Sequence, residues 1–139
     1  MENQVQANNW ISGESKKKNQ KIKVLLYSED FDFAQSFSLY FNKDFKKIVT
    51  VNDREVLNQI VKSIQPEIIV IDSPLNLSLL KCIDQIKTLS SSSKIFIFTS
   101  HTFVHQDVTK QIQRMVDKIF FQPIDLVEFN QVLNFYTAD

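Results

Sequence analysis

The 139-residue sequence has little of the residue types on which several classes of site depend. Its only glycine is Gly13 and its only cysteine is Cys82. Walker-type P-loops, dinucleotide-binding turns and the nucleophile elbow of hydrolases all need glycines, which adopt positive φ and let a phosphate approach the backbone. A single cysteine forms no internal disulfide. The sequence therefore excludes enzymes built on those loops and points to a reducing compartment.

The sequence also lacks an excess of one charge and a long apolar run. Its 16 Lys and Arg residues balance 16 Asp and Glu residues, so nothing in the overall charge attracts nucleic acid or an anionic membrane. No stretch approaches the roughly 18 apolar residues of a membrane span, and the N-terminus has no apolar run of the signal-peptide type. We expect a cytoplasmic protein that binds neither nucleic acid nor membrane.

The length predicts one domain, since domains commonly hold on the order of 150 residues. Residues 1–20 are dominated by Asn, Gln, Ser, Lys and Glu, a composition typical of a flexible tail. We therefore expect a polar N-terminal tail over residues 1–20 and a folded domain over residues 21–139.

Five short apolar runs carry the strongest structural signal. Their residues are mostly β-branched or aromatic, and they are apolar at consecutive rather than alternate positions, at residues 24–27, 48–51, 68–71, 95–98 and 119–121. Such runs are typical of parallel strands that helices cover on both faces. The sequence therefore predicts five buried strands.

Amphipathic stretches alternate with these strands, over residues 33–41, 56–64, 79–86, 102–115 and 126–136. Asn52 with Glu55, and Asp125 with Glu128, have the spacing of helix-capping boxes. Right-handed crossovers between alternating strands and helices give an α/β fold with a doubly wound sheet. We expect a three-layer, flavodoxin-like sandwich around a five-stranded parallel sheet of order 2-1-3-4-5.

In such sheets, ligands bind beyond the carboxyl ends of the strands, where the strand order reverses. Glu29 and Asp30 follow the first strand, and Asp72 follows the third, so their carboxylates are expected to meet there. Carboxylates in one cleft repel each other, which raises a pKa or recruits a hard cation such as Mg²⁺. Aspartate is also a covalent acceptor of phosphate, and Thr99 could donate a hydrogen bond to a phosphoryl oxygen. The alternative is that Asp30 or Asp32 only caps the following helix.

Four segments resemble the landmark segments of the receiver domain of two-component response regulators, over residues 21–139. They are KIKVLLYSEDFDF, PEIIVIDSPLN, KIFIFTS and KIFFQPID. The resemblance implies that Asp72 accepts a phosphoryl group from the phosphohistidine of a histidine kinase or phosphotransfer protein. It implies no enzyme activity beyond self-phosphorylation.

The resemblance also implies a set of residues around Asp72. Glu29 and Asp72 would bind Mg²⁺ with help from the Pro74 carbonyl, and Asp30 is a further candidate ligand. Thr99 would be the switch residue, whose hydroxyl moves with the phosphoryl group. Output would appear as altered protein binding at the face formed by the fourth helix, fifth strand and fifth helix.

The chain departs from the receiver pattern at several positions. Ser28 and Glu29 stand where the family has two adjacent acids, and Gln122 stands where it has a lysine before proline. An amide still donates a hydrogen bond, but charge-assisted bonds are roughly twice as strong as neutral ones. Further departures are the residues at the usual proline, glycine and aromatic switch positions, which are Asn76, Met115 and Ile119. We therefore expect weak Mg²⁺ binding and a weakened readout.

Three functions follow from these residues. The leading hypothesis is a stand-alone receiver that takes part in phosphorelay signalling through Asp72 and signals to an unknown downstream protein by contact. The alternative, motivated by Ser28 and Gln122, is a phosphorylation-independent pseudo-receiver that acts as a protein interaction module. A flavin binder of the same topology is less favoured, because the first loop is acidic where a flavin phosphate would need hydroxyls and free amides.

Overall fold

The computed structural model describes residues 21–100 and 106–137. The tail expected at residues 1–20 and the first part of the helix expected at residues 102–115 lie outside the described residues.

The centre of the molecule is a five-stranded parallel sheet, which confirms the sequence prediction. Its strands pair in the order β2-β1-β3-β4-β5. They are β1 (Lys23–Tyr27), β2 (Lys47–Val51), β3 (Ile68–Asp72), β4 (Lys94–Thr99) and β5 (Lys118–Phe121). The three inner strands are almost wholly buried, which explains their continuous apolar runs.

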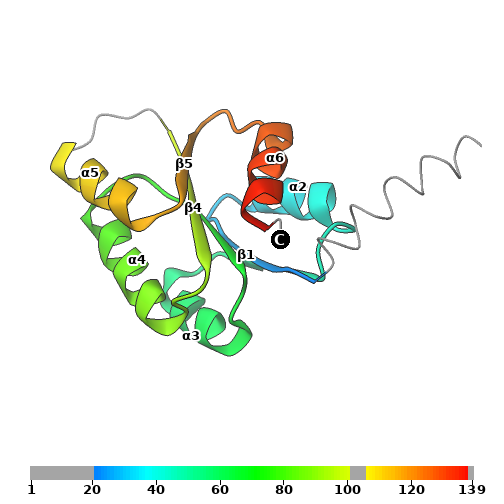
Figure 1. Ribbon diagram of the computed structural model, residues 1–139, viewed down its shortest axis with the longest axis horizontal. Helices are drawn as coiled ribbons and strands as arrows, with labels where there is room; N and C mark the ends of the chain where they lie inside the picture. The colour runs from blue at the N-terminus through cyan, green and yellow to red at the C-terminus, as the bar shows by residue number, and fades with distance from the viewer. Residues whose placement is uncertain (1–20, 101–105, 138–139) are drawn as a thin grey trace, which may run out of the picture.

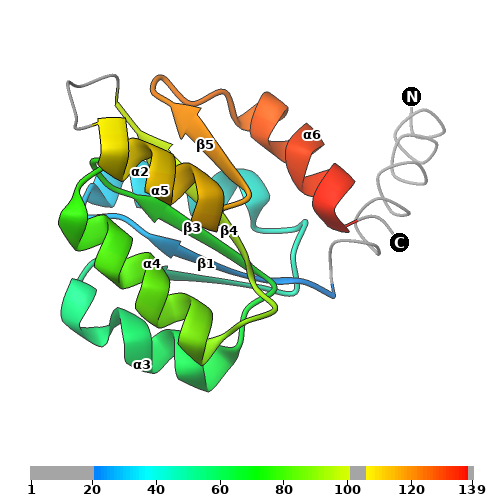
Figure 2. The same cartoon turned by 60° about the vertical axis from the view of Figure 1, so that its left-hand side comes forward.

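Helices cover both faces of the sheet, so the molecule has three layers (Figures 1 and 2). They are α2 (Phe31–Phe41), α3 (Arg54–Ile64), α4 (Leu77–Leu89), α5 (Gln106–Met115) and α6 (Leu126–Thr137). Helices α3, α4 and α5 pack on one face, and α2 and α6 pack on the other. The doubly wound sandwich is therefore as predicted.

Each face of the sheet has its own hydrophobic core, because successive strand residues point to opposite sides. Leu25 and Tyr27 enter the core beneath α3, α4 and α5, whereas Val24 and Leu26 enter the core beneath α2 and α6. The second core is rich in phenylalanine. Its rings meet edge to face around Phe129, whose centroid lies 4.9 Å from that of Phe98 and 5.3 Å from that of Phe120.

Three helices begin at carboxylate caps, one of which differs from the prediction. Asp30 caps α2 by accepting a hydrogen bond from the Phe33 amide at 3.1 Å, and Asp125 accepts from the amides of residues 127 and 128 at the start of α6. The prediction that Asn52 caps α3 is wrong. Asp53, in extended backbone, accepts from the Glu55 amide at 2.9 Å, so the cap lies one residue later.

Candidate functional site at the carboxyl edge of the sheet

The candidate site lies where the strands β1, β3, β4 and β5 end. Backbone hydrogen bonds continue the sheet past its last ladder pairs. The Ser28 amide donates to the Val51 carbonyl at 3.0 Å, and the Gln122 amide donates to the Thr99 carbonyl at 2.7 Å. Asp72 ends β3, and its Cα pairs with that of Phe98, the neighbour of Thr99 on β4. The sheet therefore fixes where these predicted site residues lie.

Both carboxylate oxygens of Asp72 accept hydrogen bonds from neutral side chains. The buried Ser28 hydroxyl donates to Oδ2 at 2.7 Å, and the Gln122 amide nitrogen donates to Oδ1 at 3.4 Å. Two positions at which the sequence departs from the receiver pattern thus contact the predicted phosphoacceptor directly. The structure brings Ser28, Asp72 and Gln122 together.

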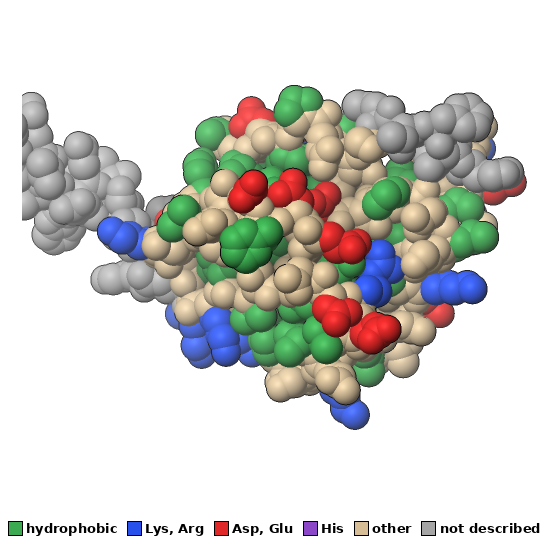
Figure 3. All heavy atoms as spheres, turned by 180° about the vertical axis from the view of Figure 1, so that it is seen from behind, with side chains coloured by type: hydrophobic (Ala, Val, Ile, Leu, Met, Phe, Trp, Pro, Cys, Tyr) green, Lys and Arg blue, Asp and Glu red, His purple; other side chains and the backbone are tan. Residues whose placement is uncertain are grey.

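The acids after β1 act on Asp72 through space. Burial raises the pKa of Asp72, the carboxylates of Asp30 and Glu29 raise it further, and the Ser28 hydrogen bond opposes the rise. Acidic side chains gather on the face seen in Figure 3, with a smaller group of basic ones beside them. The expected repulsion between carboxylates at the point where the strand order reverses is therefore present.

Thr99 has a buried hydroxyl whose hydrogen-bonding capacity is unused. The residue is 2% exposed, and its Oγ1 has no hydrogen-bond partner among the described residues. A buried hydroxyl without a partner is costly and calls for an explanation, such as an oxygen supplied by a ligand. Thr99 is thus poised as a donor at the carboxyl edge.

Comparisons with known proteins by sequence give no match, since neither a family model nor a curated protein matches this chain. Solved structures do match. A protein whose name relates it to pilus assembly, from Burkholderia pseudomallei, aligns with a TM-score of 0.70 and 16% identity over 86% of this chain and 92% of that chain. A two-component response regulator from Clostridium difficile gives a TM-score of 0.68 and 15% identity over 82% and 93% of the two chains.

The signal receiver domain of a modulated diguanylate cyclase from Desulfovibrio desulfuricans aligns with a TM-score of 0.65 and 13% identity, over 82% of this chain and 91% of that chain. The strand order and the layers of this chain are those expected of a receiver domain, and the solved structures that match it include receiver domains. The chain has the receiver-domain fold. At these identities the neighbours share the fold with the chain, and the chemistry of the receiver-like site has to be judged from its own residues.

The metal-binding residues expected for a receiver site are only partly assembled. The described residues contain no group of three or more Asp, Glu, His or Cys side chains arranged to hold a metal ion. Asp30 is engaged in capping α2, and the Pro74 carbonyl accepts a hydrogen bond from the Ser73 hydroxyl at 3.0 Å. Mg²⁺ often binds through only one or two carboxylates together with water and phosphate, so Glu29 and Asp72 fit a weak site. Magnesium binding stays a prediction.

Sequence reasoning missed one residue beside the candidate site, Arg54. As the first residue of α3, it extends its guanidinium over the Tyr27 ring, 5.1 Å from the ring centroid, and donates a hydrogen bond to the Ser73 hydroxyl at 3.4 Å. An arginine in the first turn of a helix gives no signal in a single sequence, because its partners come from distant segments.

In the part of the chain described, no helix is both long and apolar enough to cross a membrane.

Proposed function

We propose that this protein is a phosphorelay receiver that accepts a phosphoryl group on Asp72 and signals by contact with another protein. The observation that supports this most directly is the unpartnered Thr99 hydroxyl, which is buried at the strand end next to Asp72. A phosphoryl group on Asp72 would supply the acceptor oxygens that this hydroxyl lacks. The receiver fold of the neighbouring structures agrees with the proposal.

In the proposed reaction, an ionised Asp72 oxygen attacks the phosphorus of a phosphohistidine on a kinase or phosphotransfer protein. The new P–O bond forms as the P–N bond breaks, and the imidazole nitrogen leaves with the bonding pair and takes up a proton. The Ser28 hydroxyl, 2.7 Å from Oδ2, orients the carboxylate. The Gln122 amide, 3.4 Å from Oδ1, is placed to donate to the transferred group.

Magnesium would supply positive charge that this site otherwise lacks near the phosphoryl oxygens. Glu29 and Asp72, with the Pro74 carbonyl, are the residues that would hold it, and Asp30 could add its Oδ2, since its helix cap uses only Oδ1. With Ser28 in place of an acid, the site has one carboxylate fewer than the receiver pattern. We therefore expect Mg²⁺ to bind weakly.

The test is phosphoryl uptake from a small phosphodonor such as phosphoramidate, with Mg²⁺ present, followed by intact mass spectrometry. The parent chain should gain the mass of one phosphoryl group, and Asp72→Asn should gain none. Asp84→Asn, which removes an exposed acid from α4, is the matched control and should react like the parent. Equal uptake by Asp72→Asn and the parent, or no uptake by the parent, would refute the proposal.

The second candidate is a pseudo-receiver that binds a partner without phosphorylation. It is favoured by the two neutral donors on Asp72, because Ser28 and Gln122 replace charged residues of the receiver pattern. The pilus-related neighbour shows that the fold also occurs in a protein not named for phosphorelay. Mg²⁺ separates the candidates: a competent site is stabilised by the bound ion, so the melting temperature rises with Mg²⁺, whereas a pseudo-receiver shows no rise.

A further inference from the structure

A cavity lined mostly by polar residues lies between helices α3 and α4, away from the Asp72 carboxylate. Its volume is about 360 Å³. One face of each helix lines it, with Arg54 and Asn58 from α3 and Ser78, Lys81, Cys82 and Gln85 from α4. The lining side chains include two cations and no acid. This composition is the opposite of the acidic cluster around Asp72.

The guanidinium of Arg54 is poorly satisfied by its present partners. It donates to the Ser78 carbonyl at 3.3 Å, to the Ser78 hydroxyl at 3.2 Å and to the Ser73 hydroxyl at 3.4 Å. All three acceptors are neutral, and the bonds are longer than the roughly 2.7–2.9 Å of charge-assisted pairs. The guanidinium also interacts with the Tyr27 hydroxyl and the Cys82 thiol, which are neutral as well. Its Nε is buried and has no hydrogen-bond partner among the described residues. A partly buried guanidinium normally pairs with a carboxylate or a phosphate, so Arg54 lacks its usual counter-ion.

The rest of the cavity complements a ligand with one anionic group. Lys81 brings a second cation from α4, on the same face of that helix as Ser78 and Gln85. The Asn58 amide donates to the Gln85 side-chain oxygen at 2.9 Å across the groove, so the amide group of Gln85 and the oxygen of Asn58 are left for a ligand. Cys82 is buried, and burial raises the pKa of its thiol, so it presents a neutral wall.

We propose that the α3–α4 cavity binds a small molecule carrying a phosphate or carboxylate group, with Arg54 and Lys81 as the charged contacts. The Arg54 guanidinium also bonds to Ser73, the residue that follows Asp72. A ligand that binds the guanidinium would compete with this contact beside Asp72. The proposed anion site itself rests on the cavity residues and not on phosphorylation of Asp72.

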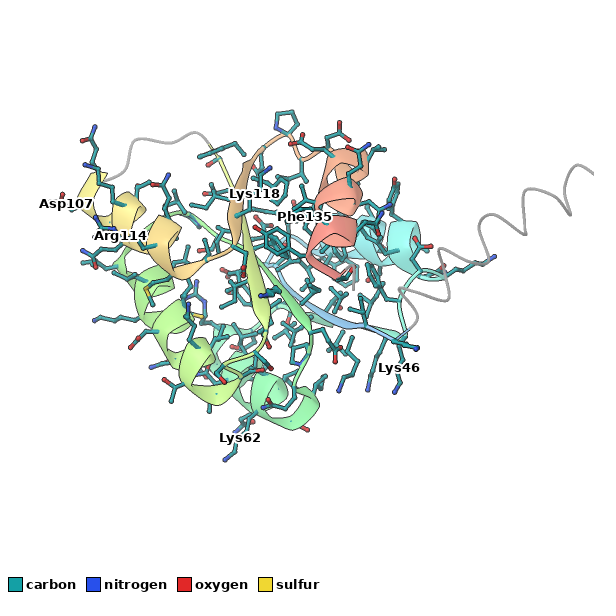
Figure 4. The ribbon with its side chains drawn as sticks, viewed as in Figure 1. Lys46, Lys62, Asp107, Arg114, Lys118 and Phe135 are labelled. Carbon is teal, nitrogen blue, oxygen red and sulfur yellow. The ribbon has the colours of Figure 1, made fainter. Side chains whose placement is uncertain are left out.

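The experiment is an amide NMR titration of the full chain with inorganic phosphate and, in parallel, with sodium acetate. At least one of the anions should give saturable shifts centred on residues 54–58 and 78–85. Lys81→Gln should weaken binding about tenfold, the loss expected when one charged hydrogen bond is removed. Lys62→Gln is the matched control, because it removes the same charge from the far end of α3, where the side chain points away from the molecule (Figure 4). It should bind like the parent.

Three results would overturn the proposal: no saturable shift with either anion, shifts centred on residues 28–30 and 72, or equal weakening by the two lysine substitutions. Arg54→Gln should abolish binding, but Arg54 also contacts the Tyr27 ring, so loss of the fold has to be checked in that variant. Lys81 is exposed, and its substitution keeps the test valid if Arg54→Gln unfolds.

Discussion

At the scale of the residue, the central feature is Asp72, an acid held by neutral donors in an acidic neighbourhood. Burial, together with the carboxylates of Asp30 and Glu29, raises its pKa, and the Ser28 hydroxyl only partly offsets this. In a receiver that carries a lysine in place of Gln122, a positive charge would counter the repulsion. Here the same position gives one long, neutral hydrogen bond. Ionised Asp72 therefore destabilises the folded chain, and a function of this residue would explain why it is present.

The free energy of unfolding, measured as a function of pH, tests whether ionised Asp72 destabilises the folded chain. An acid whose pKa is higher in the folded chain than in the unfolded chain binds its proton more tightly when folded, so stability falls as the pH rises through that range. Asp72→Asn cannot ionise. At neutral pH its free energy of unfolding should exceed that of the parent, by less than about 1 kcal/mol because solvent screens a half-buried site.

The difference between Asp72→Asn and the parent should shrink as the pH falls below the ordinary aspartate pKa of 3.8, because the parent carboxyl is then protonated in both the folded and the unfolded chain. Urea unfolding at a series of pH values measures it, with Asp84→Asn as the control for loss of one exposed acid. A difference that is the same at every pH would show that Asp72 is not strained by its ionisation.

At the scale of the element, a single side chain decides where α3 begins. The Asp53 carboxylate accepts from the Glu55 amide at 2.9 Å, whereas no hydrogen bond of the Asn52 side chain is present in the described structure. Replacing a capping residue by alanine typically costs about 1 kcal/mol. The two neighbouring residues therefore differ sharply in what they contribute to α3.

Asp53→Ala should lower the free energy of unfolding by about 1 kcal/mol, and Asn52→Ala should lower it by less than about 0.5 kcal/mol. Denaturant unfolding followed by circular dichroism compares the two variants. If Asn52→Ala were the more damaging substitution, the cap would lie where the sequence pattern placed it.

Sequence was a good guide to the elements and a poorer one to their ends. The five strands were predictable because buried parallel strands need continuous apolar runs, such as Ile68–Ile71. Asn52 with Glu55 has the capping-box spacing, whereas Val56 stands three residues after Asp53, so the pattern favours the residue that does not cap α3.

Gln65 ends α3 with a left-handed φ of 50°. Glycine or asparagine usually occupies such a position, so the sequence does not indicate that the helix ends here. The Gln65 side-chain amide donates to the carbonyl of Lys62, three residues earlier, and to that of Leu89 on α4, a distant contact that no local pattern contains.

At the scale of the whole molecule, a cluster of aromatic rings centred on Phe129 joins the sheet to the layer of α2 and α6. Phe129 on α6 is fully buried and lies within 6.0 Å, between ring centroids, of Phe37 and Phe41 on α2 and of three phenylalanines on β4 and β5. This layer also holds Asp30 and Asp125 at their caps. The carboxyl edge therefore depends on this core for its geometry.

Phe129→Ala should lower the free energy of unfolding by about 3–5 kcal/mol, because it leaves a cavity in the core. Phe135, on the same helix, is 78% exposed, and Phe135→Ala should change stability by less than about 0.5 kcal/mol (Figure 4). Chemical denaturation of the two variants provides the comparison. Similar losses from both would mean that α6 does not pack as described.

The topology predicted which residues meet at the carboxyl edge, but not how they bond. Asp72 and Thr99 end neighbouring strands, and Glu29 and Gln122 come just after the ends of β1 and β5, so the strand order brings these residues to one edge of the sheet. That the Ser28 hydroxyl would bond to Asp72 depends on a distance of 2.7 Å, which no pattern of apolar residues encodes. Arg54 was missed for the same reason, since Tyr27, Ser73 and Ser78 are joined to it only in the folded chain.

The central claim is that the Asp72 site accepts a phosphoryl group, and an amide NMR spectrum recorded with Mg²⁺ and then with beryllofluoride tests it most directly. Beryllofluoride mimics an aspartyl phosphate without needing a reactive donor. We expect weak shifts near Glu29 and Asp72 with Mg²⁺, then strong shifts at Thr99 and Gln122 that spread to β5 with beryllofluoride, and none in Asp72→Ala. An unchanged spectrum in both steps, with Asp72→Ala indistinguishable from the parent, would contradict the claim and leave the pseudo-receiver as the function of this fold.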